Sequence, residues 1–130
     1  SIATGTYVKV TYQNEIYDSD NTYDNSSNYR FTPGVAGKYV IGAKHRLDTS
    51  TDGTATILAI YKNGSTLHRV RYTLDNSEGY HMAAVLDLDN DDYVEIYAYQ
   101  NSGGTTNISG GTLGSDDTIA YFYGYRIAGV

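Results

Sequence analysis

Two short acidic segments hold the side chains with the clearest potential for chemistry. Their carboxylates are the ligands that a hard cation such as calcium prefers. The aspartates are Asp18, Asp20 and Asp24 in the first segment and Asp87, Asp89, Asp91 and Asp92 in the second. Neither segment fits an EF-hand loop, because Tyr23 and Asp92 stand where that loop requires glycine. Aspartate is also common in tight turns, so a calcium site and a solvated turn are both open, and no other cofactor is expected.

The three histidines, His45, His68 and His81, fall on three different expected strands and show no metal-ligand spacing. We expect them to serve on strand surfaces or in packing. A shared metal site or a pH switch is the alternative, since histidine changes charge near neutral pH.

The chain carries no motif typical of a catalytic site. A G-x-S-x-G nucleophile motif, paired histidines with a glutamate at metal spacing and a phosphate-binding glycine loop are all missing from the sequence. With no cysteine, the chain can form neither a disulfide nor a thiolate metal site. Two carboxylates could still meet in space as in glycoside hydrolases. We therefore expect a protein that is not an enzyme, with a glycan-active enzyme as the less favoured alternative.

Net charge and hydropathy exclude two classes of partner. The 130 residues carry a formal net charge of −6, which opposes binding to the phosphate backbone of DNA or RNA. No apolar run approaches the roughly 20 residues that span a bilayer, so membrane insertion is not expected. The sequence starts at Ser1 without a methionine, which suggests a processed or excised fragment.

Tyrosine is the unusual residue of this chain. It occurs 15 times, beside 14 glycines and no tryptophan. Two runs, 93–99 and 121–127, place tyrosines at alternate positions, as on one face of a strand. Because tyrosine joins a large apolar ring to a polar tip, such ladders could stack on carbohydrate, form a subunit interface or cover an ordinary sheet.

The pattern along the chain indicates strands throughout and no helix. Alternating or short apolar runs bounded by turn residues predict strands over 6–12, 38–46, 54–62, 66–74, 80–88, 93–99 and 118–127, with a brief extended piece at 15–17. Three polar segments, 18–28, 47–53 and 101–117, are expected to be loops that could carry recognition. About eight strands without helical periodicity predict one all-β domain over 1–130, an antiparallel sandwich or jelly roll.

Turn residues divide these strands. Pro33 fixes its own φ, and Gly34 and Gly37 can take positive φ, so residues 33–37 should form a tight corner. Asn63 and Gly64 between two strand-like runs predict a hairpin with a type I′ turn. We expect Gly124, in the last strand, to have a structural role as well.

Four segments of the chain together resemble domains of the C1q/TNF-like superfamily, in the same order and at about the same spacing. The matching residues are Tyr23, Asp24, Phe31, Thr32, Pro33, Gly37 and Tyr39, then Ile60, Lys62, Asn63 and Gly64, then Leu86, Leu88, Asp92 and Val94, and finally Phe122, Gly124, Tyr125 and Ile127. The resemblance covers residues 7–127. Ile41, Asn28 and Asp91 depart from the usual pattern, so the chain is similar to a divergent member.

The resemblance implies a ten-strand jelly roll assembled as a homotrimer. It places the last strand and the strand with Tyr39 on the sheet that faces the three-fold axis, so Tyr39, Tyr121, Tyr123 and Tyr125 are the expected interface residues. Some members hold calcium. The implied function is a non-enzymatic structural or receptor-binding adhesion module, such as the head of a phage fibre or a virion decoration protein. It would bind a cell-surface glycan or protein outside the cell or on a virion. A secreted bacterial or animal ligand or lectin of the same fold is the alternative.

Overall fold

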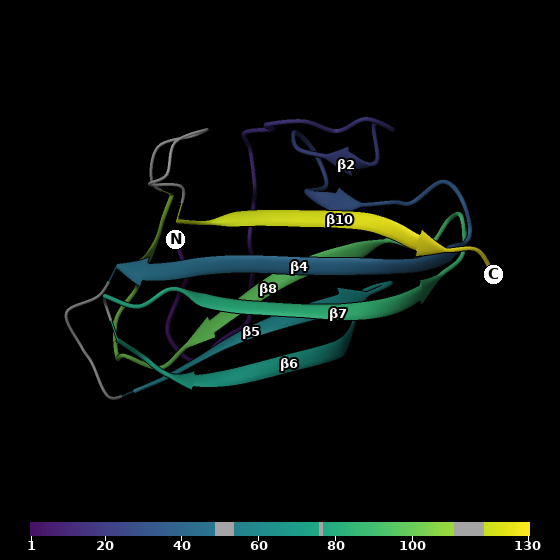
Figure 1. Cartoon of the computed structure of the whole chain (residues 1–130). Helices are drawn as coiled ribbons and strands as arrows, with labels where there is room; N and C mark the ends of the chain where they lie inside the picture. The colour runs from purple at the N-terminus through teal and green to yellow at the C-terminus, as the bar shows by residue number, and fades with distance from the viewer. Residues whose placement is uncertain (49–53, 76, 111–118) are drawn as a thin grey trace.

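The computed structural model describes residues 1–48, 54–75, 77–110 and 119–130, and within them the chain contains strands and no helix (Figure 1). The strands are β1 Val8–Lys9, β2 Tyr23–Asp24, β3 Arg30–Phe31, β4 Gly37–Asp48, β5 Ala55–Lys62, β6 Ser65–Thr73, β7 Tyr80–Leu88, β8 Val94–Gln100, β9 Asn107–Ser109 and β10 Tyr121–Ala128. The described residues therefore include no candidate for a membrane-spanning helix. The prediction of an all-β chain is confirmed.

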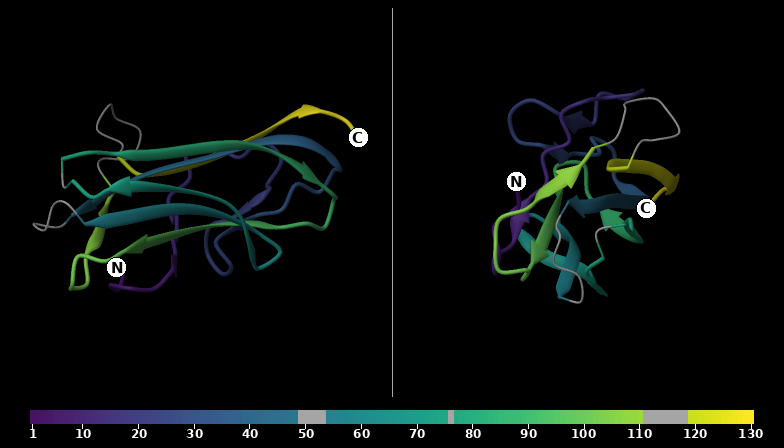
Figure 2. Two further views of the ribbon diagram at one scale, coloured as in Figure 1. Left: turned by 90° about the horizontal axis from the view of Figure 1, so that it is seen from below. Right: turned by 90° about the vertical axis from the view of Figure 1, so that its left-hand side faces the viewer.

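Two antiparallel sheets pack face to face (Figures 1 and 2). One sheet has the strand order β2-β3-β8-β5-β6, with β1 added on β8. The other has the order β10-β4-β7, and β9 pairs with the far end of β4. Between β4 and β5, between β6 and β7 and between β7 and β8 the chain passes from one sheet to the other. The predicted β-sandwich is therefore confirmed.

Strand β4 shows how the alternating sequence builds the core. Tyr39, Ile41 and Ala43 point inward and are buried, whereas Val40 and Lys44 are only half-buried on the outer face. Successive side chains of a strand alternate between faces, which is the arrangement predicted from the sequence. The buried cluster draws on both sheets and contains Ile2, Val10, Phe31, Tyr39, Ile41, Ala43, Leu47, Leu58, Ile60, Leu74, Tyr80, Leu86, Leu88, Val94, Ile96 and Ala98.

Short strands appear where the sequence predicted loops. β2 lies inside the segment 18–28 and β9 inside 101–117, because neighbouring strands supply backbone partners that these polar residues can use. Conversely, the extended piece expected at 15–17 forms no strand, and both Ile16 and Tyr17 are exposed. A segment forms a strand only where a neighbouring strand pairs with its backbone. The predictions from local composition were therefore wrong for β2, β9 and residues 15–17. Of the predicted loops, residues 49–53 and 111–117 lie outside the described residues.

The turn residues have the predicted structural roles, with one correction. Asn63 and Gly64 have φ values of 52° and 79°, so the predicted positive-φ hairpin turn between β5 and β6 is confirmed. Gly34 has a φ of 69° beside the buried Pro33, and its amide donates to the Asn90 carbonyl oxygen over 3.1 Å. Gly37 instead begins β4 without a positive φ.

Close packing explains why residues 37 and 124 are glycine. A Cβ on Gly37 would lie 2.5 Å from the carbonyl oxygen of Ala128, so a side chain would disturb the last strand. Gly124 faces the core, where a Cβ would lie 3.0 Å from Cδ1 of Ile41 and 3.4 Å from Cε2 of Phe31. Both positions need glycine for space, and the expectation of a positive φ at Gly37 was wrong.

Candidate functional site

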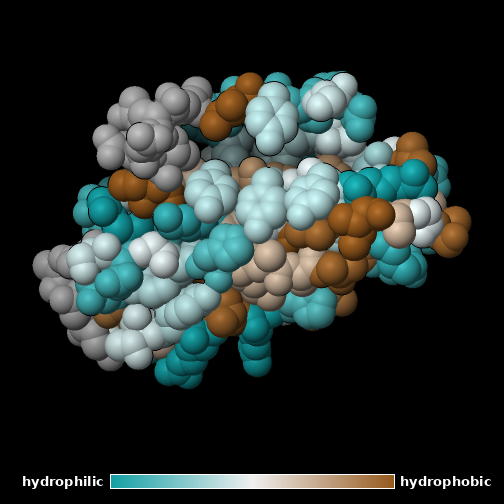
Figure 3. All heavy atoms as spheres, viewed as in Figure 1, coloured by the Kyte–Doolittle hydropathy of each residue, from teal (hydrophilic) through white to brown (hydrophobic). Residues whose placement is uncertain are grey.

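The outer face of the β10-β4-β7 sheet carries a row of tyrosines, which we call the tyrosine face. Strand β10 turns Phe122 toward the core, so Tyr121, Tyr123 and Tyr125 project from the opposite face. Adjacent ring centroids lie 6.1 Å and 6.5 Å apart. Figure 3 shows this face with pale aromatic rings in a row beside hydrophobic side chains. The predicted alternation of the last strand is confirmed.

Neighbouring strands extend the tyrosine face with apolar groups. Val40 of β4 lies between Tyr125 and Val85 in the strand register. Val85 is 57% exposed and Tyr125 is 55% exposed, and these two large apolar side chains flank the central strand β4 on the same face. An exposed cluster of this kind is typical of an interaction surface.

Tyr123 is held in place at the centre of this face. Its hydroxyl lies 2.9 Å from Nε2 of His81 on β7, and the two rings are parallel within 13°. Desolvation, followed by the neighbouring phenols of Tyr121 and Tyr125, raises the pKa of Tyr123. Lys44 lies over the ring of Tyr121 at 5.9 Å. The rings are thus ordered within a single chain, before any partner is added.

Tyr39 does not belong to this face. Its side chain is 5% exposed and points into the core, where its ring meets the ring of Phe31 edge-on at 5.7 Å. Its hydroxyl donates to the Val35 carbonyl oxygen over 2.6 Å. The assignment of Tyr39 to a subunit interface is therefore corrected: the alternation of β4 turns it inward, so almost none of its surface remains for a partner.

A second ring cluster lies on the outer face of the six-stranded sheet. Tyr97 stacks on Tyr61 with centroids 4.0 Å apart, and Tyr7 approaches Tyr99 at 5.2 Å. The sequence predicted the ladder at 93–99. It did not predict that Tyr61 of β5 and Tyr7 of the N-terminal segment would lie beside that ladder. Only the pairing of β5 with β8 brings Tyr61 beside Tyr97.

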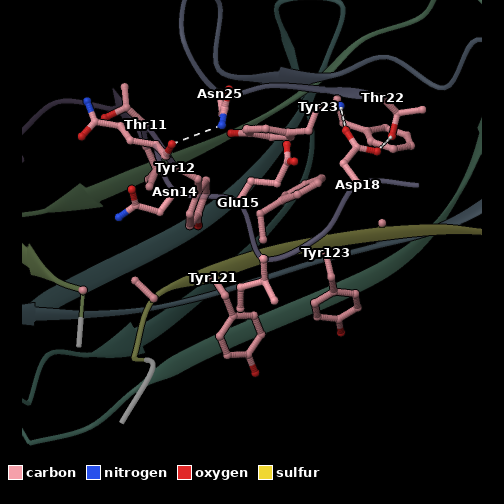
Figure 4. Close-up of a pocket in the computed structure, with 18 of the residues that line it drawn as sticks. Thr11, Tyr12, Asn14, Glu15, Asp18, Thr22, Tyr23, Asn25, Tyr121 and Tyr123 are labelled. Atoms are coloured by element: carbon pink, nitrogen blue, oxygen red, sulfur yellow. Dashed lines mark hydrogen bonds between the residues drawn. The ribbon is translucent and has the colours of Figure 1, made fainter. Parts of the chain in front are cut away.

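A groove with a volume of about 1350 Å³ lies between β10 and the N-terminal segment, residues 9–25 (Figure 4). Its aromatic wall is formed by Tyr12 and Tyr23 packed against Phe122, at centroid distances of 6.1 Å and 4.9 Å. Figure 4 shows these two tyrosines on the N-terminal side, with Tyr121 and Tyr123 along β10. We call this feature the β10 groove.

Polar side chains border the β10 groove. The Asp18 carboxylate accepts hydrogen bonds from the Tyr23 amide over 2.7 Å and from the Thr22 hydroxyl over 3.1 Å. Partial burial acts to raise the pKa of Asp18, but these hydrogen bonds outweigh it and lower the pKa. Asn25 Nδ2 donates to the Gln13 carbonyl oxygen over 3.3 Å. These bonds fix the loop that carries the rim.

Tyr12 is the unusual group of the groove. Its hydroxyl is shut off from solvent and has no hydrogen-bond partner among the described residues. Burial, with a smaller effect from the Tyr23 phenol, raises the pKa of Tyr12 well above its ordinary value. A buried hydroxyl without a partner carries a free-energy cost of roughly 1–3 kcal/mol. No pattern in the sequence pointed to this position, because Tyr12 reads simply as an apolar residue of a strand.

The acidic segments serve turns and ion pairs. Asp24 accepts hydrogen bonds from the amides of Ser26, Ser27 and Asn28 at 2.9–3.0 Å, which lower its pKa. Asp18 stabilises the turn before β2, as described above. Asp20 is exposed beside it.

The second acidic segment behaves in the same way. Asp92 pairs with Lys62 at 2.7 Å, and this hydrogen bond lowers its pKa to about 2 against a small opposing effect of burial. Asp87 pairs with Lys38 at 2.9 Å, while Asp89 and Asp91 lie in an exposed turn. Across the described residues no group of three His, Cys, Asp or Glu side chains is placed to hold a metal ion. We therefore make no calcium proposal.

The histidines lie in three different environments. His68 is exposed on β6, and His81 belongs to the tyrosine face. His45 is fully buried, and neither ring nitrogen has a hydrogen-bond partner within the described part of the chain. Its ring meets Tyr80 edge-on at 6.3 Å, and desolvation lowers its pKa from 6.5 to about 4.

These features define an antiparallel β-sandwich with an open tyrosine face and an aromatic groove. No protein-family profile matches the chain. The chain is similar to the "Uncharacterized protein YqcC" of Bacillus subtilis (strain 168), with 33% identity over 106 residues. The match covers 75% of this chain and 29% of the length of YqcC, so the chain spans less than a third of that relative.

Proposed function

We propose that this chain is a non-enzymatic, homotrimeric structural and receptor-binding module with a jelly-roll fold. The module acts on the surface of an extracellular assembly or a virion, as the head of a fibre or a decoration protein. It recognises a cell-surface glycan or protein. The observation that carries the proposal is the tyrosine face, an ordered and exposed apolar surface on the outer side of the β10-β4-β7 sheet.

The strand pairing supports the jelly-roll part of the proposal. β3 pairs with β8, β4 with β7 and β5 with β6, so the pairs nest inside one another along the chain. The nested pairs alternate between the two sheets, as they do when a long antiparallel ribbon wraps into a sandwich of two Greek keys.

The chemistry of the tyrosine face supports self-association. Tyrosine is enriched at protein interfaces, because its ring buries a large apolar area while its hydroxyl finds a polar partner. Here the face combines Tyr121, Tyr123 and Tyr125 with exposed Val85, and Lys44 lies over the ring of Tyr121. Covering Val85 and Tyr125 would remove apolar surface from water at about 25 cal/mol per Å². Three copies around an axis would bury this face on each chain.

The match to YqcC supports the view of a module. The matched region is 29% of the length of YqcC, the proportion expected when a compact domain forms one part of a longer chain. A head domain on a fibre would be used in this way, with a rigid sandwich that carries recognition on its surface.

Light scattering after size-exclusion chromatography, at micromolar concentration, tests the assembly. We expect a particle of three times the 14.2 kDa chain mass. Tyr125→Ser and Val85→Ser should each shift it toward the monomer, because each removes an exposed apolar group from the face. Leu67→Ser is the matched control, since Leu67 is 44% exposed on β6 of the other sheet. A wild-type monomer, or dissociation caused equally by the control, would overturn the proposal.

A further inference from the structure

We propose that the β10 groove is the recognition site and that its ligand is a neutral or amine-bearing oligosaccharide, with anionic glycans excluded. This inference rests on the receptor-binding role proposed above and narrows it to one site and one class of ligand. The groove runs along β10, and its lining shares Tyr121, Tyr123 and Tyr125 with the tyrosine face.

The shape and the aromatic lining of the groove suit a sugar. Its volume of about 1350 Å³ is large enough for several linked pyranose rings rather than for one small molecule. Tyr12, Tyr23 and Phe122 form its aromatic wall, and Tyr17, 84% exposed, stands at its border. A pyranose ring presents one face of C–H groups, which packs against an aromatic ring, while its hydroxyls remain free to form hydrogen bonds.

The polar lining matches the hydroxyl groups of a sugar. Side-chain amides and hydroxyls that can both donate and accept hydrogen bonds outnumber the carboxylates along the groove. They belong to Thr11, Gln13, Asn14, Ser19, Thr22 and Asn25. The Tyr12 hydroxyl is shut off from solvent, so Tyr12 contributes its ring to the groove and not its hydroxyl. A cationic peptide would meet the carboxylates but would use few of these amides, so we favour the sugar.

Charge decides which sugars fit. Glu15, Asp18 and Asp20 line the groove, and none of them forms an ion pair with a described residue. The described lining also holds two cations. Lys9 is already paired with Glu95 at 2.7 Å. Arg126 Nη2 donates to the neutral Ala36 carbonyl oxygen over 2.8 Å and keeps its charge, so the three carboxylates outnumber the one unpaired cation. The groove is therefore negative within a chain of net charge −6, which repels sialic acid, sulfate and phosphate groups and attracts an amine.

A glycan array tests the class of ligand. The labelled wild-type protein is applied to neutral hexose and N-acetylhexosamine oligosaccharides, to glucosamine oligosaccharides and to sialylated and sulfated glycans. We expect binding to the neutral or amine-bearing sets alone. Preference for the anionic set would overturn the proposal. Capture of oligolysine peptides without any sugar binding would also overturn it and would assign the groove to a cationic peptide.

Variants then test the site, with calorimetry on the best array ligand. Tyr17→Ala should weaken binding by about tenfold, the loss of one stacking contact on an exposed ring of the groove. Tyr61→Ala, on the outer face of the other sheet, is the matched control and should leave binding unchanged.

Reversing one charge in the groove is the last test. Together with the control variant, it separates the proposal for the groove from the proposed receptor-binding role. Glu15→Lys should reduce binding of glucosamine oligosaccharides at least tenfold and allow weak binding of sialylated ones. If Tyr61→Ala abolishes glycan binding and no groove variant changes it, the groove is not the recognition site. The proposed receptor-binding role would still stand. A trimer that binds no glycan of any class would overturn both the groove and the glycan part of the proposed function.

Discussion

The ring of Tyr123 lies against the backbone of Gly42 and fills the space that a Cβ at residue 42 would occupy. The two residues face each other across β10 and β4 in the sheet register. An aromatic ring laid over a glycine on the next strand covers an otherwise bare stretch of backbone. Gly42 therefore sets the position of the central ring on the tyrosine face, and this relationship leads to the first prediction.

Gly42→Ala should displace Tyr123 from the sheet and weaken self-association. The new methyl group overlaps the ring, which must swing away from Gly42 and from His81. We expect a loss of roughly 1–3 kcal/mol in unfolding free energy, as for other overpacked sites, and a shift toward monomer. Urea unfolding and light scattering measure the two effects. Gly104→Ala is the matched control, because a Cβ there meets nothing within 4 Å. Equal behaviour of the two variants would contradict the prediction.

His45 should make the fold sensitive to mild acid. Its pKa is about 4 in the folded chain and near 6.5 when unfolded, so the unfolded state binds more protons between these values. Stability should be complete above about pH 6.5 and fall as the pH decreases toward 4, by on the order of 3 kcal/mol. Chemical unfolding at several pH values measures this slope.

His45→Phe should flatten the pH dependence between 6.5 and 4, because the buried ring no longer titrates. The exposed His68 supplies the control, and His68→Gln should keep the wild-type slope. The carboxylates with lowered pKa, such as that of Asp92, begin to lose their contribution below about pH 5, so the slope due to His45 is measured between pH 6.5 and about 5. An unchanged slope in His45→Phe would show that other groups cause the acid response.

Asn63 should stabilise two turns together. Its Nδ2 donates to Asp92 over 2.7 Å, and its Oδ1 accepts from the Tyr93 amide over 2.9 Å, joining the β5–β6 turn to the start of β8. It also holds a positive φ of 52°, which alanine tolerates poorly. We expect Asn63→Ala to cost about 2 kcal/mol in unfolding free energy, measured by thermal and urea denaturation. Asn14→Ala, at an exposed position, should change stability by less than about 0.5 kcal/mol.

Lys9 should be required to keep Glu95 buried. The two charged atoms lie 2.7 Å apart, and the Glu95 side chain is only 8% exposed, whereas Lys38 and Asp87 form an open surface pair. Lys9→Met leaves a buried carboxylate without its cation and should cost about 2–3 kcal/mol. Lys38→Met should cost less than about 1 kcal/mol. Similar losses from both variants, in urea unfolding, would refute the distinction.

The sequence predicted the sandwich because the evidence for it is local. Alternation over residues 38–46 and 118–127 determines which side chains face inward, and the positive φ needed at Asn63 and Gly64 determines the hairpin. The short strands β2 and β9 escaped prediction, because their residues pair only when β3 and β4 lie alongside.

The candidate sites were predictable in part. Tyr121, Tyr123 and Tyr125 share a face by alternation alone, so the sequence determined that they lie together. The same alternation also places Tyr39 inward, and only the resemblance suggested otherwise. The β10 groove had no local signature, because Tyr12 and Phe122 stand 110 positions apart in the sequence and meet only after folding.

The sequence by itself thus determined the strands, the main hairpin and the sides of each strand, because these follow from the two-residue period of a strand and from the φ preferences of single residues. Only the tertiary structure decided that the aspartates serve turns and ion pairs, that His45 lies without a polar partner in the described core, and that an aromatic groove runs beside β10. The physical reason is that burial, desolvation and ion pairing depend on which distant segments meet, and local patterns do not contain that information.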